Sequence, residues 1–151
     1  MNKLFITTMK LGFDRIIFFI LLMPFLFSQN TASAQNWTQV GSDIDGEAAG
    51  DLSGSVSLSS DGSTVAIGAI GNDDNGNGSG HVRIYKNISG TWTQQGSDID
   101  GEATGDVSGR SSLSSDGSTV AIGATGNDGN GSSAGHVRIY KNISGTWTQQ
   151  G

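Results

Sequence analysis

The sequence has 151 residues with 24 Gly, one Pro and no Cys, so a disulfide-stabilised scaffold is excluded. From residue 35 onward, only 32 of 117 residues are Ala, Val, Ile, Leu, Trp or Tyr, which excludes a large conventional core and a membrane span in this part. The same part has 13 acidic and 5 basic residues, a net charge of −8, whereas nucleic acids and anionic lipids attract clustered Lys and Arg. We therefore expect no nucleic-acid partner, and divalent cations are the more natural ligands.

The first 34 residues are typical of a secretory signal peptide. Residues 1–15 contain three basic side chains, residues 16–27 are an apolar run, and Ala32-Ser33-Ala34 provides small residues before a cleavage site after Ala34. Twelve residues rise only about 18 Å as a helix, whereas the hydrocarbon core of a bilayer is about 30 Å thick. We therefore predict export, which places the mature protein in the periplasm, outside the cell or at the cell surface, without a membrane span.

An internal repeat of 55 residues organises the remainder. Trp37, Trp92 and Trp147 are 55 positions apart, and residues 37–91 match residues 92–146 at 45 of 55 positions. A period of this order is typical of solenoids, propellers and repeat arrays. The expected organisation is a leading outer strand (36–41) and an acidic loop within residues 35–54, a first repeat with its following loop at 55–109, and a second repeat at 110–151.

Each repeat predicts four short strands. In the first repeat, the alternation of apolar and polar residues predicts strands at 55–59, 63–70, 81–88 and 91–95. Asp61-Gly62 predicts a type I′ hairpin turn between the first two strands. The second strand has Val65 and Ile67 on one face and the small Ala66 and Gly68 on the other, so we expect cover on both faces and a close approach of the neighbouring repeat.

Burial is expected to fade towards the fourth strand, which keeps only Trp92 as an apolar anchor. This gradient is typical of a β-propeller blade, whose inner strands lie between neighbouring blades and whose outermost strand lies in water. We therefore predict an all-β fold of two four-stranded antiparallel blades plus the leading outer strand, forming an incomplete propeller. A flat solenoid or a tandem array of sandwiches is the alternative, because a repeat does not determine its own curvature.

The segment GDLSGSVSLSSDGSTVAIGA at residues 50–69, which recurs with substitutions at 105–124, resembles the FG-GAP repeat. The resemblance implies an integrin-alpha-type β-propeller of the variant found in bacterial secreted proteins, used for extracellular binding or adhesion. The calcium loop of that family corresponds to residues 59–63 here, where Asp61 is the only carboxylate. Because calcium takes six to eight oxygen ligands, we do not expect it at this place.

Two acidic loops are the candidate cation sites, and calcium is the one cofactor that the sequence suggests. Their carboxylates stand at relative positions 1, 3, 5 and 9, a spacing that lets one loop wrap an ion. The alternative is a solvated acidic turn in which Asp side chains cap backbone amides. The residues are Asp43, Asp45, Glu47 and Asp51 in the first loop and Asp98, Asp100, Glu102 and Asp106 in the second.

Two further features are weaker candidates. Residues 73–78 begin like an EF-hand loop, but no acidic residue follows at its twelfth position, and we interpret them as a mobile hairpin loop. His81 and His136 occupy the same position in the two copies, whereas a catalytic Ser-His-Asp set needs differently placed partners at one site. We therefore expect surface or strand-edge histidines next to an Asp.

These observations favour an exported, non-enzymatic binding or adhesion module, with an extracellular protein or a glycan as its ligand. A fragment of a secreted carbohydrate-active enzyme and a structural surface repeat without a specific ligand are the alternatives. Two blades are too few to close a ring. The chain is therefore expected to be a fragment, to assemble from several copies, or to adopt a different two-sheet structure, and self-association or further repeats are expected to be needed.

Overall fold

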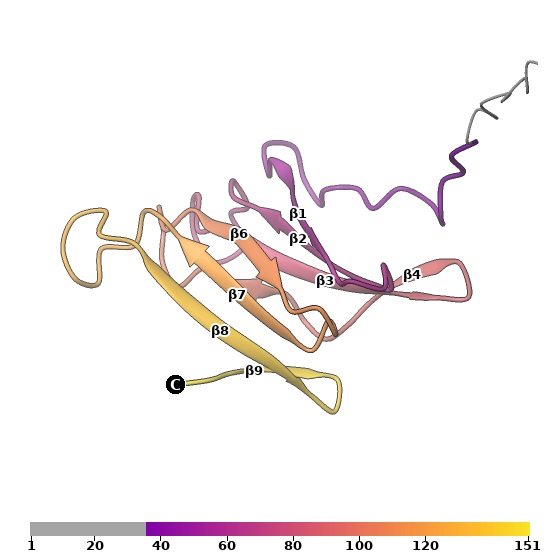
Figure 1. Ribbon diagram of the computed structural model, residues 1–151. Helices are drawn as coiled ribbons and strands as arrows, with labels where there is room; N and C mark the ends of the chain where they lie inside the picture. Colours follow the sequence, from indigo (N-terminus) through magenta and orange to yellow (C-terminus); the bar gives the residue numbers. More distant parts are fainter. Residues whose placement is uncertain (1–35) are drawn as a thin grey trace, which may run out of the picture. The chain divides into compact units, whose positions relative to one another are not determined.

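Two antiparallel sheets, one from each repeat, form the regular structure of the protein (Figure 1). The structure is a computed structural model that describes residues 36–151, so the expected signal peptide, residues 1–34, lies outside the described residues. Residues 38–151 form one compact unit. Residues 36–151 contain strands and no helix, which confirms the all-β class and the two four-stranded antiparallel meanders.

The strands follow the chain in simple meander order. The first sheet has the order β1-β2-β3-β4, with the short β5 paired to β3, and the second has the order β6-β7-β8-β9. The four strands expected in each repeat are present, with ends shifted by at most two residues. The bounds are β1 Ser53–Leu58, β2 Thr64–Ala69, β3 His81–Ile88, β4 Thr91–Gln94, β5 Ile99–Asp100, β6 Ser108–Leu113, β7 Thr119–Ala124, β8 His136–Ile143 and β9 Thr146–Gln149.

The prediction of a leading outer strand at residues 36–41 is wrong, because these residues form no strand. A strand needs a row of backbone hydrogen bonds to a neighbour. Residues 36–41 pair with no described strand. The Trp92 indole Nε1 donates to the Val40 carbonyl oxygen at 2.9 Å, and Arg83 Nη2 holds the adjoining acidic loop by donating to the Asp45 carbonyl oxygen at 2.7 Å. Trp147 and Arg138 hold Gln95 and Asp100 of the second acidic loop in the same way.

The turn chemistry also differs from the prediction. At residues 59–62 the Gly62 amide donates to the Ser59 carbonyl oxygen, and only Gly62 has a positive φ, so this turn is not type I′. The Asp61 carboxylate stabilises the turn by accepting from the Ser59 hydroxyl and the Ser63 amide. The paired positive φ values that type I′ requires occur at Ser89 and Gly90, between β3 and β4.

The main core lies between the two sheets. Ala66, Val82 and Ile84 of the first sheet form one buried cluster with Ile99 of β5 and with Val120, Ile122 and Tyr140 of the second sheet. A Cβ atom at Gly68 would lie 1.7 Å from the Gly109 carbonyl oxygen, so the backbones of β2 and β6 touch there. The close approach expected for the small face of the second strand is therefore present.

This packing changes the burial of β3. Alternation predicts a half-buried strand, but residues 81–85 are all buried, because the second sheet covers one face of β3 and the first acidic loop packs on the other. The equivalent strand β8 keeps the half-buried pattern. The junction between the repeats therefore encloses side chains that either repeat alone would leave in water.

Candidate functional site

Each acidic loop is fastened by its last carboxylate. Asp51 Oδ2 accepts the Ala48 amide at 3.0 Å, and Asp106 Oδ2 accepts the amides of Glu102 and Ala103 at 3.1 Å. Both carboxylates are buried, and each also accepts from the side-chain amide of an Asn, Asn72 or Asn127. These hydrogen bonds give the two Asp residues the capping role that was the alternative to cation binding.

The other carboxylates of a loop do not gather around one point. Asp43 Oδ1 accepts from the Gln39 amide at 2.8 Å, and Asp98 accepts from Gln94 in the same way. Asp45 is exposed, whereas its counterpart Asp100 is half-buried. Among residues 36–151, two groups of three or more His and acidic side chains have ligand atoms within 4.8 Å of one another, and neither group is a whole loop.

The larger group, here called the junction cluster, consists of Glu47, Asp74, His81 and Asp98. It joins the first acidic loop, the 73–78 loop, the start of β3 and the second acidic loop. His81 Nδ1 lies 3.7 Å from Glu47 Oε2 and 3.8 Å from Asp98 Oδ2. The His81 side chain is 0% exposed, and neither of its ring nitrogens has a hydrogen-bond partner.

The surroundings of His81 contradict the expectation of a surface or strand-edge histidine. Its backbone lies in the interior of the first sheet, paired with Ala69 of β2 and with Asp100 of β5. The carboxylates face its Nδ1 at distances longer than a hydrogen bond. A buried imidazole with two free nitrogens next to three acidic side chains has the chemistry of a metal ligand.

Arg83 fixes the orientation of Glu47. Its Nη1 lies 3.5 Å from Glu47 Oε1, which leaves Oε2 facing His81. The guanidinium also lies over the Tyr85 ring at 5.7 Å from the ring centroid, a cation–π geometry. Arg83 therefore binds the backbone of the first acidic loop, orients Glu47 of that loop and packs on the Tyr85 ring.

The second cluster, formed by Glu102, Asp106 and His136, repeats only part of this arrangement. His136 Nδ1 lies 3.7 Å from Glu102 Oε2, and Arg138 Nη1 lies 3.5 Å from Glu102 Oε1. Gly129 stands at the position equivalent to Asp74, and the His136 side chain is 26% exposed. The two clusters therefore share a histidine, a glutamate and an arginine but differ in carboxylates and burial.

Burial also perturbs an acid beside the junction cluster. Desolvation, reinforced by the nearby Asp98 carboxylate, raises the pKa of Asp100 above its ordinary value. Asp100 Oδ1 is buried without a hydrogen-bond partner. The negative charge of Asp100 is therefore unfavourable in the folded protein.

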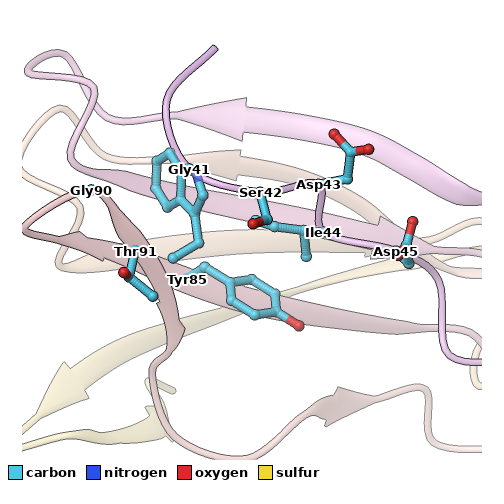
Figure 2. A pocket seen from close by; sticks show the side chains of 9 residues that line it. Gly41, Ser42, Asp43, Ile44, Asp45, Tyr85, Gly90 and Thr91 are labelled. Atoms are coloured by element: carbon cyan, nitrogen blue, oxygen red, sulfur yellow. The ribbon is translucent and has the colours of Figure 1, made fainter.

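A second kind of site is an open cleft that occurs once per repeat, between an acidic loop and the hairpin of the sheet on which it packs. Figure 2 shows the first cleft, in which Ile44 points towards Tyr85 while the Asp43 carboxylate points away from that ring. The first cleft is lined by Gly41, Ser42, Asp43, Ile44, Asp45, Tyr85, Gly90, Thr91 and Trp92. The second cleft is lined by the nine residues 55 positions further on, from Gly96 to Trp147.

In the remaining loops, the polar side chains make hydrogen bonds within the protein. Hydrogen bonds from Ser59 and Ser63 lower the pKa of Asp61 to about 2, and Ser114 and Ser118 act equally on Asp116. Asp73 Oδ1 accepts the Gly78 amide at 2.7 Å, and the Asn75 amide donates to the Gly101 carbonyl oxygen at 2.6 Å. The 73–78 loop, interpreted from the sequence as mobile, is thus tied to the second acidic loop, which brings Asp74 to the junction cluster.

His81 and Asp74 are the functional candidates that the sequence interpretation missed. Asp74 is the only acidic residue of the repeats without an acidic counterpart, because Gly129 replaces it, and this asymmetry was the available signal. Glu47 and Asp98 were expected in two separate loop sites, and the structure brings them to one histidine.

No family model matches the chain, and no curated protein matches it. Among the residues that the structure describes, no helix has the length and apolarity needed to cross a bilayer. The clefts and clusters are therefore interpreted from their own geometry.

Proposed function

We propose that this protein is an exported, non-enzymatic binding or adhesion module whose blade-like repeats present one ligand cleft each. The observation that carries this proposal is the recurrence of the same open cleft, with the same amino acid at each of its nine lining positions, at an interval of 55 residues. A module with two copies of one site gains avidity for a ligand that repeats the recognised group.

The chemistry of the cleft suits a glycan. Tyr85 and Trp92 border it with aromatic surface, and Ser42, Asp45 and Thr91 border it with polar groups. Tyr and Trp supply apolar contact area at low conformational cost, and carboxylates accept hydrogen bonds from sugar hydroxyl groups. The indole Nε1 of Trp92 already donates to the Val40 carbonyl oxygen, so the ring is held in place before a ligand arrives.

The blades are proposed to be part of a propeller that is completed by further copies or further repeats. The face of the first sheet that packs on the second contains Val82 and Ile84, whereas the equivalent Val137 and Ile139 of the second sheet are 66% and 45% exposed. On the first sheet, Leu58 of β1 is 57% exposed, whereas its counterpart Leu113 packs on the core. The two free faces are therefore complementary in the way that the two sheets already are.

The test is a glycan array followed by calorimetric titration of the best binder. Thr91→Tyr and Thr146→Tyr place a bulky ring in each cleft from an exposed position of the hairpin. We expect each single variant to halve the binding stoichiometry and the double variant to abolish binding. Thr93→Tyr with Thr148→Tyr is the matched control, because both threonines are exposed on β4 and β9 but lie outside the clefts.

The outcomes separate the alternatives. Retained glycan binding in the double cleft variant would refute the clefts as the ligand site. Turnover of a polysaccharide would favour the enzyme hypothesis, and a protein ligand blocked by the same substitutions would leave the clefts correct but change the ligand class. Absence of any cleft-dependent ligand would favour a structural surface repeat.

A further inference from the structure

We propose that the junction cluster binds a divalent first-row transition-metal ion, for which zinc is the best match, and that this ion fastens both acidic loops to the first sheet. Four side chains provide one imidazole nitrogen and three carboxylate oxygens whose ligand atoms all lie within 4.8 Å of one another: Glu47, Asp74, His81 and Asp98. Four such ligands complete the tetrahedral shell of a structural zinc site.

The buried imidazole is independent support for a ligand at this place. His81 is 0% exposed, and both of its ring nitrogens lack hydrogen-bond partners, although buried polar atoms are nearly always paired. Its Nδ1 faces the carboxylates of Glu47 and Asp98. A metal ion between these atoms would satisfy Nδ1, one of the two ring nitrogens that lack a partner.

The distances fit an ion of this size. Zinc bonds of about 2.0 to 2.2 Å at tetrahedral angles separate neighbouring ligand atoms by about 3.4 Å. The separations of 3.7 Å and 3.8 Å from His81 Nδ1 to the two carboxylates need only a few tenths of an ångström of side-chain rotation to reach that value. Glu47 and Asp74 are exposed, so the cluster has an open side through which an ion enters.

The ligand types select the metal. Calcium and magnesium prefer oxygen-only shells, whereas imidazole nitrogen favours zinc and its neighbours in the first transition series. Three carboxylates meet one histidine, and Arg83 lies beside only one of them, so a divalent cation also balances charge. This site differs from the calcium loops that the acidic spacing predicted, because it takes one carboxylate from each loop, Glu47 and Asp98, and its other two ligands from outside the loops.

The consequence is mechanical. Glu47 precedes β1, His81 begins β3, and Asp98 lies on the link to the second sheet, so one ion would hold together the loop before the first sheet, the sheet itself and the link that follows it. The same ion would fix the link from which the second sheet packs. In an exported protein without cysteine, a metal supplies the cross-link that disulfides would otherwise provide.

The experiment is titration of the chelator-treated protein with zinc chloride by calorimetry, with thermal unfolding measured in parallel. We expect one equivalent to bind and to raise the melting temperature, with no comparable binding of calcium or magnesium at the same concentration. Anomalous diffraction at the zinc edge is expected to place the ion beside His81. No zinc binding, or an ion located elsewhere, overturns the proposal.

Two variants assign the site. Asp74→Gly copies the residue that the second repeat carries at position 129, so it preserves a sequence compatible with the fold. We expect it to weaken zinc binding by at least about tenfold, the loss typical even for groups that only support a metal ligand. His136→Ala, in the second cluster, is the control and is expected to leave the affinity and the single equivalent unchanged.

Two results would contradict this assignment. Unchanged affinity in Asp74→Gly removes Asp74 from the ligands and with it the four-ligand site. Loss of the zinc equivalent in His136→Ala places the ion at the second cluster. If His81 served only as a protonated partner of the carboxylates, zinc would leave the melting temperature unchanged, which also overturns the proposal.

Discussion

The two repeats share 45 of 55 residues, yet the same side chains have different surroundings in them. Val82 is 0% exposed and Val137 is 66% exposed, although both follow the histidine that begins the third strand of their sheet. The difference arises because the second sheet packs on the Val82 face of the first sheet, while nothing among residues 36–151 packs on the Val137 face of the second. Burial is therefore a property of the junction between repeats and not of the repeat sequence.

The two proposed binding sites follow the same division. The clefts lie within each repeat and its preceding loop, so they occur twice with the same lining. The junction cluster needs an acidic side chain from the following loop, so its full set occurs once among residues 36–151. Two copies of one cleft suit the binding of a ligand that repeats the recognised group. A cluster built from several segments suits a cross-link between those segments.

Gly68 and Gly123 give the largest expected contrast between the repeats. In Gly68→Val the new Cβ would lie 1.7 Å from the Gly109 carbonyl oxygen, so the sheets must separate, whereas at Gly123 the nearest atom is 3.7 Å away. We expect Gly68→Val to lower the free energy of unfolding by at least about 3 kcal/mol. Gly123→Val should change it by no more than about 0.5 kcal/mol, as surface substitutions do.

Urea denaturation of both variants measures this contrast. Equal losses of unfolding free energy would show that the second sheet is covered in solution as the first one is. Small changes in both variants would show that the sheets do not pack closely at β2 and β6.

The free face of the second sheet predicts association between copies. Val137→Lys with Ile139→Lys places two charges on the face that in the first sheet is buried against its neighbour. We expect concentration-dependent association of the unaltered protein in light scattering and a monomer for this double variant, because desolvating two ammonium groups is costly. A monomer at every concentration of the unaltered protein would contradict the prediction.

Ile143→Lys is the control for the association test. Ile143 is 52% exposed on the same strand, β8. Its counterpart Ile88 stays 53% exposed although the second sheet covers the first, so this position lies outside the packed face. The control variant should therefore associate as the unaltered protein does.

Local features of the fold could be predicted from the sequence. Successive side chains of a strand point to opposite faces of the sheet, so the alternation of apolar and polar residues is enough to predict a strand. The strand predicted at 81–88 matches β3, and the same residues one repeat later form β8. The type of the turn at Asp61 could not be predicted from the Asp-Gly pair. The Asp61 carboxylate accepts hydrogen bonds from Ser59 and Ser63, and Asp61 does not adopt the positive φ that type I′ requires. Residues 36–41 form no strand because no described strand pairs with them, whereas the equivalent residues one repeat later, in β4, pair with β3.

The junction cluster could not be predicted, because it depends on long-range packing. Glu47 and Asp98 are 51 positions apart and belong to loops that look self-sufficient in sequence. His81 is buried where β5 pairs with the start of β3 and Asp98 of the second acidic loop faces the imidazole, whereas His136, at the start of the equivalent strand β8, has a partly exposed side chain. The spacing of the carboxylates within each loop therefore suggested a calcium site per loop. In the folded chain, one carboxylate from each loop, Glu47 and Asp98, lies beside His81 instead.

The smallest expected effect concerns the pH dependence of stability. Burial and Asp98 raise the pKa of Asp100 in the folded protein, so the folded state binds this proton more tightly than the unfolded state does. The free energy of unfolding therefore falls as the pH rises from the ordinary Asp pKa, 3.8, through the folded pKa, and it stays lower above that pKa. Asp100→Asn should remove this loss, making the variant more stable than the unaltered protein at neutral pH.

Unfolding of both proteins in chelator between pH 3 and pH 8 measures the difference. Asp61 and Asp116, with pKa values of about 2, lose their stabilising charge as the pH falls towards that value, but they do so equally in both proteins and cancel in the difference. Asp45→Asn is the matched control, because Asp45 is the exposed counterpart of Asp100 in the first acidic loop. A gain confined to Asp100→Asn confirms that the junction buries an acid that the free loop leaves in water, whereas equal effects in both variants would assign the change to the loop sequence alone.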